Sequence, residues 1–527
     1  MNTQSDSLYQ SPLMGDMIVS ACARWSDRPA LKDGLNQLTY SELSEWISTT
    51  IQYLKSIGLV AGDPIALLTK NCIEGVVVFY AANVMGLRYT PLHPMGAEDD
   101  HAFILDDAGI AILFADAPFA DRAERLRNNV ASLTRIIRLR DKSHPDDLGR
   151  NIKAFENKPI FCEAEPVGIS FLGYTGGTTG KPKGVMLSQR SITALNVIAL
   201  TDWEWPDQIR VLVVTPISHA GMALLLPTHV RGGTVFLDEQ FTPAGFLATV
   251  ETERINVTFV VPTMIYAVLD DEHMNEFGAS SLQLVLYGAA PMSPARLREA
   301  MEKIGPVFGQ IYGQTEAPMM LTYLSTSDHV EAIESGNDQR LASCGTVCTG
   351  VLLALLDENL EEIRENGVVG EICARSPLVM DGYYNRTDET EAAFAGGWLH
   401  TGDMAYRDEH GFYYIVDRSK DMIISGGFNV FPKEIEDVLS GHPGVSSAAV
   451  IGIPDEKWGE MVLAVVVPKP GQNLSFEELA ALVKEKKGPI YAPKKIEFVD
   501  SIPVTGLGKP DKKVIREKYW RQSDRKV

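Results

Sequence analysis

Short apolar runs rich in β-branched residues alternate with amphipathic stretches over about the first four hundred residues. Four of these runs end in turn-forming residues and predict buried strands at 210–218, 233–239, 256–263 and 282–291. Residues 243–255 and 293–304 lie between such runs and carry apolar side chains every three to four positions, which predicts helices. Strands that alternate with helices in this way indicate βαβ units and a largely parallel sheet.

The pattern changes twice further along the chain. From about residue 345 to 416 it favours a barrel-like or mixed β subdomain, because strand-like runs are separated by Gly, Asn and Asp turns. Those runs lie at 351–363, 367–376 and 411–419. Residues 433–500 then predict the order helix, strand, strand, helix, strand, which indicates a small α+β domain. We expect the linker to this domain at 418–420.

Composition narrows the class of protein. A chain of 527 residues is long enough for two to four domains. Its net charge of -21 argues against a general nucleic-acid binder, which needs a basic face to displace counterions. The polar start lacks the features of a secretory signal, and the apolar runs fall short of the ~20 residues that span a bilayer. Because the six cysteines are scattered and complete no zinc set, we expect buried thiols in a cytoplasmic protein.

One glycine- and threonine-rich stretch, YTGGTTGKPKGV at 174–185, predicts an anion-binding loop. Glycines allow close backbone approach, threonine hydroxyls donate hydrogen bonds, and lysines add positive charge. The P-loop of many NTPases requires a glycine where this chain has Thr175, and Ser or Thr where it has Pro182. Proline supplies neither a hydroxyl for a metal nor a backbone N–H for a phosphate. The loop therefore binds phosphate in some way other than a P-loop.

Five motifs resemble those of the adenylate-forming superfamily, which includes acyl-CoA synthetases, peptide-synthetase adenylation domains and luciferases. The phosphate loop is the first of them. The others follow in the family's order: YGQTE at 312–316, GWLHTGD at 397–403, DRSKDMIISGGFNVFPKEIE at 417–436 and PVTGLGK at 503–509. Together they cover most of the chain.

The resemblance implies an α/β fold. It consists of a large N-terminal domain of two αβ subdomains plus a β-barrel subdomain, and a small mobile α+β C-terminal domain. On this sequence we expect the N-terminal adenylation domain at 1–417, the hinge at 418–420 and the C-terminal lid domain at 421–527. The implied reaction joins a carboxylic acid to AMP with release of pyrophosphate, and a nucleophile then expels AMP.

The resemblance also implies roles for matching residues. Lys509 is expected to contact the α-phosphate and the substrate carboxylate, and loss of such a group costs about 3 kcal/mol of transition-state stabilisation. Glu316 is expected to ligate Mg²⁺, and Thr315 to donate to the α-phosphate. Asp403 and Arg418 are expected to bind the ribose.

Other positions are implied to bind ATP or AMP or to move the lid. Tyr312 and the segment 288–291 are expected to line the adenine slot, and Lys420 is the expected hinge residue. The full set implied to surround the nucleotide further comprises Thr175, Gly176, Gly177, Thr178, Thr179, Gly180, Lys181, Lys183, Gly288, Ala289, Ala290, Pro291 and Gly313.

The stretch TPISHAGM at 215–222 is expected to line the acid pocket. Amino-acid-activating relatives carry an aspartate where this chain has Ala220, so an α-amino acid is not the expected acid. His219 is interpreted as a pocket wall or gate, and the small residues Ala220 and Gly221 leave room for a hydrophobic or cyclic acid.

The acceptor is left open between two classes. Gly426 and Gly427 lie where CoA ligases pass the pantetheine arm, which favours CoA as the acceptor. Relatives such as the coronafacic-acid ligases transfer the acyl group to an amine instead, giving an amide. A nucleotide-binding protein without catalysis is a third hypothesis, against which the complete set of matching catalytic residues argues. A plain ATPase would release phosphate without any acid.

Overall fold

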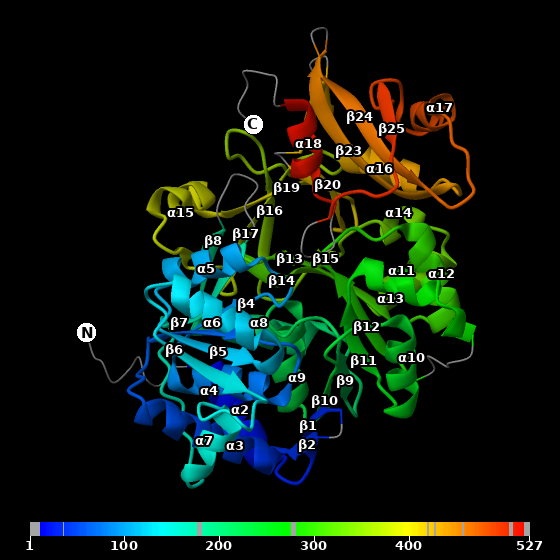
Figure 1. Cartoon of the computed structure of the whole chain (residues 1–527). Helices are drawn as coiled ribbons and strands as arrows, with labels where there is room; N and C mark the ends of the chain where they lie inside the picture. Colours follow the sequence, from blue (N-terminus) through cyan, green and yellow to red (C-terminus); the bar gives the residue numbers. More distant parts are fainter. Residues whose placement is uncertain are drawn as a thin grey trace.

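The computed structural model describes residues 11–34, 36–175, 182–275, 281–418, 421–425, 428–455, 458–504 and 510–520. The chain forms two large mixed sheets, a smaller antiparallel sheet and a carboxyl-terminal α+β unit (Figure 1). The predicted α/β class, with a large N-terminal domain and a smaller C-terminal one, is confirmed. The predicted domain boundaries stay a prediction.

The first sheet has seven strands in the order β18-β8-β7-β4-β3-β5-β6. They are β3 (Pro64–Leu68), β4 (Arg88–Leu92), β5 (Ile112–Asp116), β6 (Arg135–Leu139), β7 (Ile169–Thr175), β8 (Lys183–Ser188) and β18 (Gly382–Tyr383). Strands β3 to β7 run parallel, and β8 turns back antiparallel to β7. The loops after β3 and β4 therefore emerge side by side at one edge of this sheet.

The second sheet has nine strands in the order β15-β14-β13-β12-β11-β9-β10-β1-β2. They are β1 (Pro29–Asp33), β2 (Asn36–Thr39), β9 (Arg210–Val213), β10 (Thr234–Leu237), β11 (Val257–Val260), β12 (Leu284–Gly288), β13 (Phe308–Gln314), β14 (Ala317–Leu324) and β15 (Thr346–Val347). Strands β9 to β12 are the four that the apolar runs predict, and they are parallel as expected.

The predicted helices between these strands are α10 (Pro243–Thr252) and α12 (Pro294–Ile304). Each begins with a proline in its first turn, where the missing N–H costs nothing. In α10 the Thr242 side chain also caps the backbone N–H of Gly245. The run 256–263 is a strand only to Val260, because Pro262 begins α11 (Pro262–Leu269).

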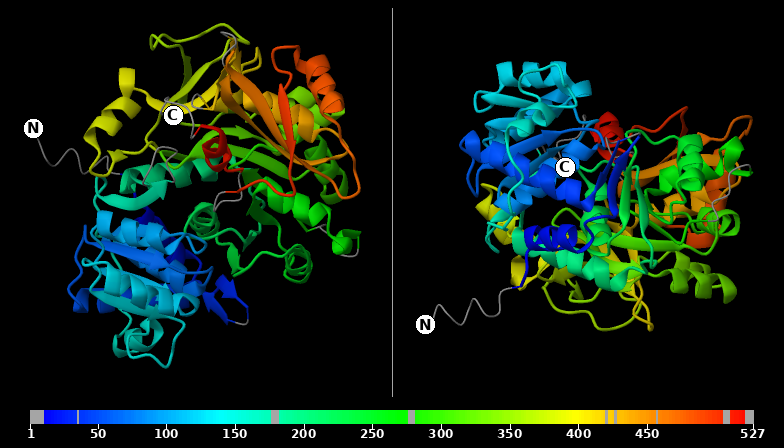
Figure 2. Two further views of the ribbon diagram at one scale, coloured as in Figure 1. Left: turned by 45° about the horizontal axis from the view of Figure 1, so that its top comes forward. Right: turned by 90° about the horizontal axis from the view of Figure 1, so that it is seen from below.

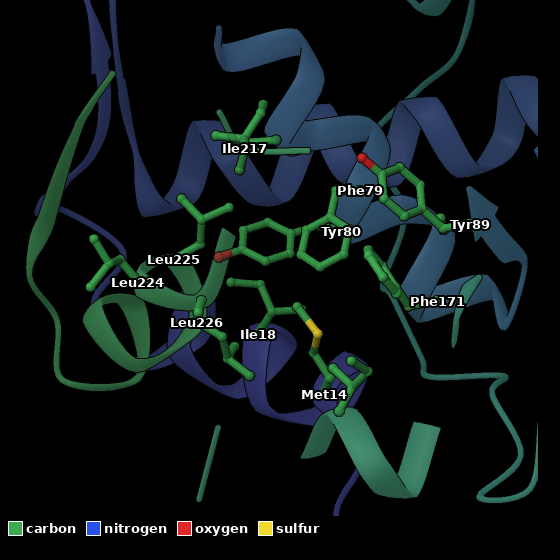
Figure 3. Packing of buried hydrophobic residues seen from close by; sticks show 14 of the residues in the cluster. Met14, Ile18, Phe79, Tyr80, Tyr89, Phe171, Ile217, Leu224, Leu225 and Leu226 are labelled. Carbon is green, nitrogen blue, oxygen red and sulfur yellow. The ribbon is translucent and has the colours of Figure 1, made fainter. Parts of the chain in front are cut away.

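The remaining helices of the N-terminal part cover the sheets. They are α2 (Met14–Arg24), α3 (Tyr40–Ser56), α4 (Ile73–Met85), α5 (Glu98–Asp107), α6 (Ala120–Asn129), α7 (Leu148–Asn151), α8 (Gln189–Asp202), α9 (Leu225–Val230), α13 (Thr326–Glu334), α14 (Asp338–Leu341) and α15 (Thr387–Ala393). Helix α4 is apolar all round and almost wholly buried, as a helix enclosed by its neighbours must be. Its Tyr80 lies at the centre of the core that Figure 3 shows, among Ile18, Leu225 and Ile217.

The β subdomain is a four-stranded antiparallel sheet. It comprises β16 (Leu352–Leu356), β17 (Gly370–Arg375), β19 (Leu399–Arg407) and β20 (Tyr413–Arg418). The three strand-like runs predicted for this region correspond to β16, β17 and β20. Strand β19 carries the GWLHTGD motif into this sheet.

The carboxyl-terminal unit follows the predicted order of elements. Helix α16 (Pro432–Ser440), strands β23 (Val445–Asp455) and β24 (Gly459–Pro468), helix α17 (Phe476–Lys487) and strand β25 (Lys495–Phe498) succeed one another. The hairpin β21 (Ile423–Ser425) and β22 (Phe428–Val430) precedes them, and α18 (Lys512–Trp520) follows. Figure 2 shows this unit, in orange and red, packed as a body of its own against the rest of the chain.

Two expectations from composition can be compared with the fold. All six cysteines are free thiols, and all but Cys162 are buried. Among the helices of the described ranges, none combines the length and the apolar character needed to cross a bilayer.

Candidate active site

Tyr312 and Asp403, which come from different sheets, meet at the predicted ribose position. The Tyr312 hydroxyl donates a hydrogen bond to Asp403 Oδ2 at 2.7 Å. Burial and the adjacent carboxylate raise the pKa of Tyr312 well above its ordinary value, so the hydroxyl keeps its proton and remains a donor. The Asp403 carboxylate is only 6% exposed and is thereby held in one orientation.

The segment of β19 before Asp403 is held from behind by strand β17, at an irregularity in their pairing. Glu371 Oε1 accepts the backbone N–H of Gly402 at 2.8 Å, and its Oε2 pairs with His400 Nδ1 at 2.8 Å. The Thr401 hydroxyl donates to the carbonyl of Ile372 at 2.7 Å. Gly402 has φ of 74°, a left-handed conformation that favours glycine. The position of Asp403 is therefore set by its neighbours before any ligand arrives.

The predicted metal ligand, Glu316, lies with Thr315 in the turn between β13 and β14. The Tyr383 hydroxyl donates to Glu316 Oε1 at 2.9 Å, and the Glu316 carbonyl accepts the N–H of Met380 at 2.8 Å. A half-buried carboxylate with one hydroxyl donor keeps acceptor capacity for a hard cation. The Glu316 carboxylate in this turn is therefore a suitable ligand for Mg²⁺.

Lys183, predicted to contact phosphate, lies near the same tyrosine. Its ammonium group stands 5.1 Å from the centre of the Tyr383 ring and forms an ion pair with Glu389 of α15. Thr175 is paired with Lys183 across strands β7 and β8. The two ends of the predicted phosphate loop are thus held together by the sheet.

The predicted adenine segment follows β12 without a break. Gly288 packs so tightly that an added Cβ would lie 2.4 Å from the carbonyl oxygen of Ile311. Ala289 has φ of 65°, a conformation that residues other than glycine rarely adopt. Ala289 and Pro291 are exposed, and Ala290 is half-buried. Gly313 is equally confined, since a Cβ there would meet Met319 N at 2.3 Å. Backbone strain of this kind is typical of ligand-binding segments.

The predicted acid pocket lies where the second sheet meets the first. His219 and Ala220 are half-buried at the start of the short 3₁₀ helix Ala220–Leu224, while Gly221 is buried. The His219 ring stands edge-on to the ring of His93, with centroids 4.6 Å apart. Burial, with a smaller contribution from His93, lowers the pKa of His219 to about 3, and burial also lowers the pKa of His93. The wall is therefore uncharged at neutral pH.

Several predicted residues lie outside the described residues. They are Gly176, Gly177, Thr178, Thr179, Gly180 and Lys181 of the phosphate loop, with Lys420, Gly426, Gly427 and Lys509. Arg418 is described for its backbone, which is paired with Asp403 across strands β20 and β19. Val504, the second residue of the last motif, and Pro510, which follows the motif, form an antiparallel bridge.

One described contact crosses the predicted linker, and two ion pairs lie on its carboxyl-terminal side. The backbone N–H of Lys433, in the first turn of α16, donates to the buried Asp417 carboxylate at 3.0 Å. Arg516 of α18 pairs with Asp421 at 2.7 Å, and Lys512 pairs with Glu436 at 2.8 Å. These contacts place α16 and α18 against the chain on both sides of residues 418–420.

Three residues of the site were not predicted from the sequence. They are His93 in the predicted pocket wall, Tyr383 on Glu316, and Glu371 behind the segment of β19 before Asp403. His93 could have been found, because it directly follows strand β4 at the carboxyl edge of a parallel sheet, where ligands bind. Nothing in the local sequence around Tyr383 or Glu371 indicates their partners.

A fold of two αβ sheets, an antiparallel sheet and a separate small domain, with these motifs at the junction, defines an adenylate-forming enzyme. The family model described as "AMP-binding enzyme" matches residues 18–384, and "AMP-binding enzyme C-terminal domain" matches residues 434–509. The chain belongs to the AMP-binding enzyme family.

Similar proteins of known name are ligases. A medium/long-chain-fatty-acid–CoA ligase of Mycobacterium tuberculosis is 43% identical over 99% of this chain and 93% of its own length. A feruloyl-CoA synthase of Amycolatopsis is 35% identical over 93% of this chain and 96% of its own. The structure of an amide bond synthetase from Marinactinospora thermotolerans, 31% identical, superposes with a TM-score of 0.87 over 96% of this chain and all of the other.

These likenesses support the function predicted from the motifs. The chain is an ATP-dependent ligase that activates a carboxylic acid and transfers it to CoA or to an amine.

Proposed function

We propose that the residues predicted from the motifs form the catalytic site, and that the acid has an uncharged hydrophobic or cyclic tail. The observation that carries the site assignment is the Tyr312–Asp403 hydrogen bond of 2.7 Å. This bond links two motifs whose residues are 91 positions apart, and it orients the Asp403 carboxylate in advance. A carboxylate held in this way is suited to accept hydrogen bonds from the two ribose hydroxyls of AMP. Arg418, opposite Asp403 in the sheet, reaches the same sugar in this proposal.

In the first half-reaction a carboxylate oxygen of the acid attacks the α-phosphorus of ATP. The new acyl–phosphate bond forms as the bond to the pyrophosphate leaving group breaks. Thr315 donates to the α-phosphate, and Lys509 contacts both the phosphate and the substrate carboxylate. Mg²⁺ held by Glu316 would neutralise charge on the phosphates. Positioning and fixed charge therefore supply the catalysis.

Three features of the pocket wall support an uncharged tail for the acid. His219 and His93 are neutral and lie edge to face, so they offer no ion pair to a second carboxylate or to an ammonium group. Ala220 offers no carboxylate for an amino group. Apolar and aromatic tails pack well against such a wall.

CoA is the acceptor that we propose. The relatives named as CoA ligases support it, and so does the sequence, because glycines at 426 and 427 carry no side chain that would obstruct a pantetheine arm. A second candidate acceptor is an amine, and the close superposition on an amide bond synthetase favours it. Both routes end with attack on the acyl carbon and loss of AMP.

We place the enzyme in the cytoplasm. Free thiols at all six cysteines fit a reducing compartment, where ATP and CoA are available.

The proposal is tested by product analysis. The protein is incubated with ATP, Mg²⁺, a panel of aromatic and aliphatic acids, and either CoA or a mixture of amines. Mass spectrometry should detect AMP with a thioester, or AMP with an amide if the second candidate holds. Phosphate release without acid would contradict both.

Lys420→Pro tests the hinge in the same assay. A proline fixes φ and restricts the preceding residue, so it should prevent the domain rotation between half-reactions. We expect ATP–pyrophosphate exchange to persist while acyl transfer is lost. Equal loss of both half-reactions would refute the hinge assignment.

A further inference from the structure

We propose that Asn71 is a positioning residue for acid selectivity, fixing the backbone that presents His219 to the acid. This inference rests on the proposed function, because it assigns the segment 215–222 to the acid pocket. Asn71 lies in the loop between β3 and α4, and its side chain is 96% buried, being 4% exposed. It belongs to the first sheet, whereas the segment that it holds belongs to the second.

Both the Nδ2 group and the Oδ1 atom of the Asn71 amide form hydrogen bonds with the same stretch of backbone. Its Nδ2 group lies within hydrogen-bond distance of the carbonyls of Val213 at 3.2 Å and Thr215 at 3.1 Å. Its Oδ1 accepts the N–H of Ile217 at 2.9 Å. Nδ2 also contacts the carbonyl of Asp238, after β10, at 2.9 Å. One side chain therefore fixes the chain at every second residue from the last residue of β9 to Ile217.

This clamp acts on the residues that lead to His219. The carbonyl of Thr215 faces Asn71 and also crowds Gly221, where an added Cβ would lie 2.3 Å from its oxygen. The carbonyl of the intervening Pro216 accepts the N–H groups of His219 at 2.9 Å and Gly221 at 3.2 Å. A shift of residues 213–217 would therefore move both His219 and Gly221.

The other side of the segment is held by packing. The Ile217 side chain is 3% exposed and lies in the core around Tyr80 and Leu225, as Figure 3 shows. The backbone N–H of Ile217 donates its hydrogen bond to Asn71 Oδ1. Because His93 follows β4, the strand beside β3, the same sheet edge supplies both the clamp and the imidazole that faces His219. The separation of the two rings is thus set by the contact of the two sheets through Asn71.

Only an amide fits this position. Aspartate has nearly the same shape, but it carries acceptors alone and would face three carbonyl oxygens without a donor. Asn71→Asp therefore tests the hydrogen bonds without creating a cavity. Leaving buried carbonyls without a partner changes equilibria on the order of 10- to 100-fold.

The chain offers a matched control at the opposite end of β9. Asn256 is also buried, accepts the N–H of Arg210 through Oδ1, and donates to the carbonyl of Gln208. Asn256→Asp loosens the same strand away from the pocket. The two variants should lower the apparent Tm alike.

The experiment measures pyrophosphate release with a panel of short, branched and aromatic acids, with separate titrations of acid and ATP. We expect Asn71→Asp to raise the KM for the acid on the order of 10-fold or more, to reorder the acids, and to leave the KM for ATP within about threefold. Asn256→Asp should keep the wild-type order of acids. An unchanged order in Asn71→Asp, or the same reordering in Asn256→Asp, would overturn the assignment.

A second measurement covers the case in which Asn71→Asp does not fold. In the wild-type protein, the Ile217 amide should exchange with deuterium as slowly as the core strands, because Asn71 and the buried Ile217 side chain protect it. Exchange at the rate of an open loop would contradict the clamp. If the wild-type protein releases no pyrophosphate with any acid, the proposed function itself is wrong.

Discussion

In the proposed site, the nucleotide side and the acid side are built in opposite ways. On the nucleotide side a carboxylate, Asp403, is oriented by a protonated tyrosine and by the segment of β19 that Glu371 holds. On the acid side two neutral imidazoles face each other, and an amide at Asn71 holds the backbone behind them. The nucleotide side therefore presents a charged group, whereas the acid side presents uncharged groups.

The difference follows from what each side must recognise. ATP is the same in every turnover, so fixed charges and rigid hydrogen bonds suit it. The acid differs between members of the family, and an uncharged wall can be reshaped by small changes in backbone position. We therefore expect substitutions on the two sides to separate the KM for ATP from the KM for the acid.

The largest effect should come from Lys509→Ala, since in the proposed mechanism Lys509 contacts both the α-phosphate and the carboxylate of the acid. Loss of a fixed positive charge at the transition state costs about 3 kcal/mol, so ATP–pyrophosphate exchange should fall by two orders of magnitude or more. A supplied acyl-adenylate should still be transferred to the acceptor. Both rates can be measured on one preparation.

The matched control for this variant is Lys513→Ala, because Lys513 is exposed at the start of α18. It should leave exchange unchanged. Normal exchange by Lys509→Ala would refute the role of Lys509.

A smaller effect, confined to the nucleotide side, is expected for Tyr312→Phe. The change removes the hydroxyl that orients Asp403, and one hydrogen bond to a carboxylate is worth about 1 to 2 kcal/mol. The KM for ATP should rise roughly 5- to 30-fold while the order of acids stays the same. Tyr414→Phe removes a similar hydroxyl, 2.8 Å from Asp408, and should change neither value. If Tyr312→Phe and Tyr414→Phe changed the KM for ATP equally, the Tyr312 hydroxyl would have no specific role on the nucleotide side.

The smallest expected effect is a loss of stability at low pH that comes from a buried, neutral histidine. His229 is fully buried between the Tyr80 hydroxyl and the carbonyl of Ala30, and burial lowers its pKa to about 4. The unfolded chain binds a proton at this residue below pH 6.5, whereas the folded chain does so only near pH 4. Stability is therefore lost as pH falls through this window, by at most about 1.4 kcal/mol per pH unit for this residue.

The measurement is the apparent Tm at pH 7 and pH 5. The wild-type value should drop by a few degrees on acidification. His229→Gln, whose amide can both donate and accept, should lessen the drop, and the exposed His410→Gln should leave it as it is. A drop of the same size in all three proteins would contradict the assignment to His229.

Local sequence patterns predict much of this fold and little of its tertiary pairing. The parallel strands β9 to β12 and the order of elements from α16 to β25 follow from apolar periodicity and turn residues, which act within a few positions. The motifs likewise indicate Asp403 and Glu316 from neighbouring residues alone.

The pairing of the supporting residues could not be predicted, because the partners are far apart in sequence. Tyr312 and Asp403 are 91 positions apart, and Asn71 and Thr215 are 144 apart. Single buried polar side chains carry no periodicity, and their choice of partner depends on how two sheets meet. The role of Asn71 becomes visible only when both sheets are in place.

The most direct test of the central claim is acid-dependent formation of AMP and pyrophosphate from ATP by the purified wild-type protein. With an aromatic or aliphatic acid and a suitable acceptor, we predict one AMP and one pyrophosphate for each thioester or amide formed. Nucleotide turnover that does not depend on the acid, or release of ADP and phosphate instead, would contradict the account.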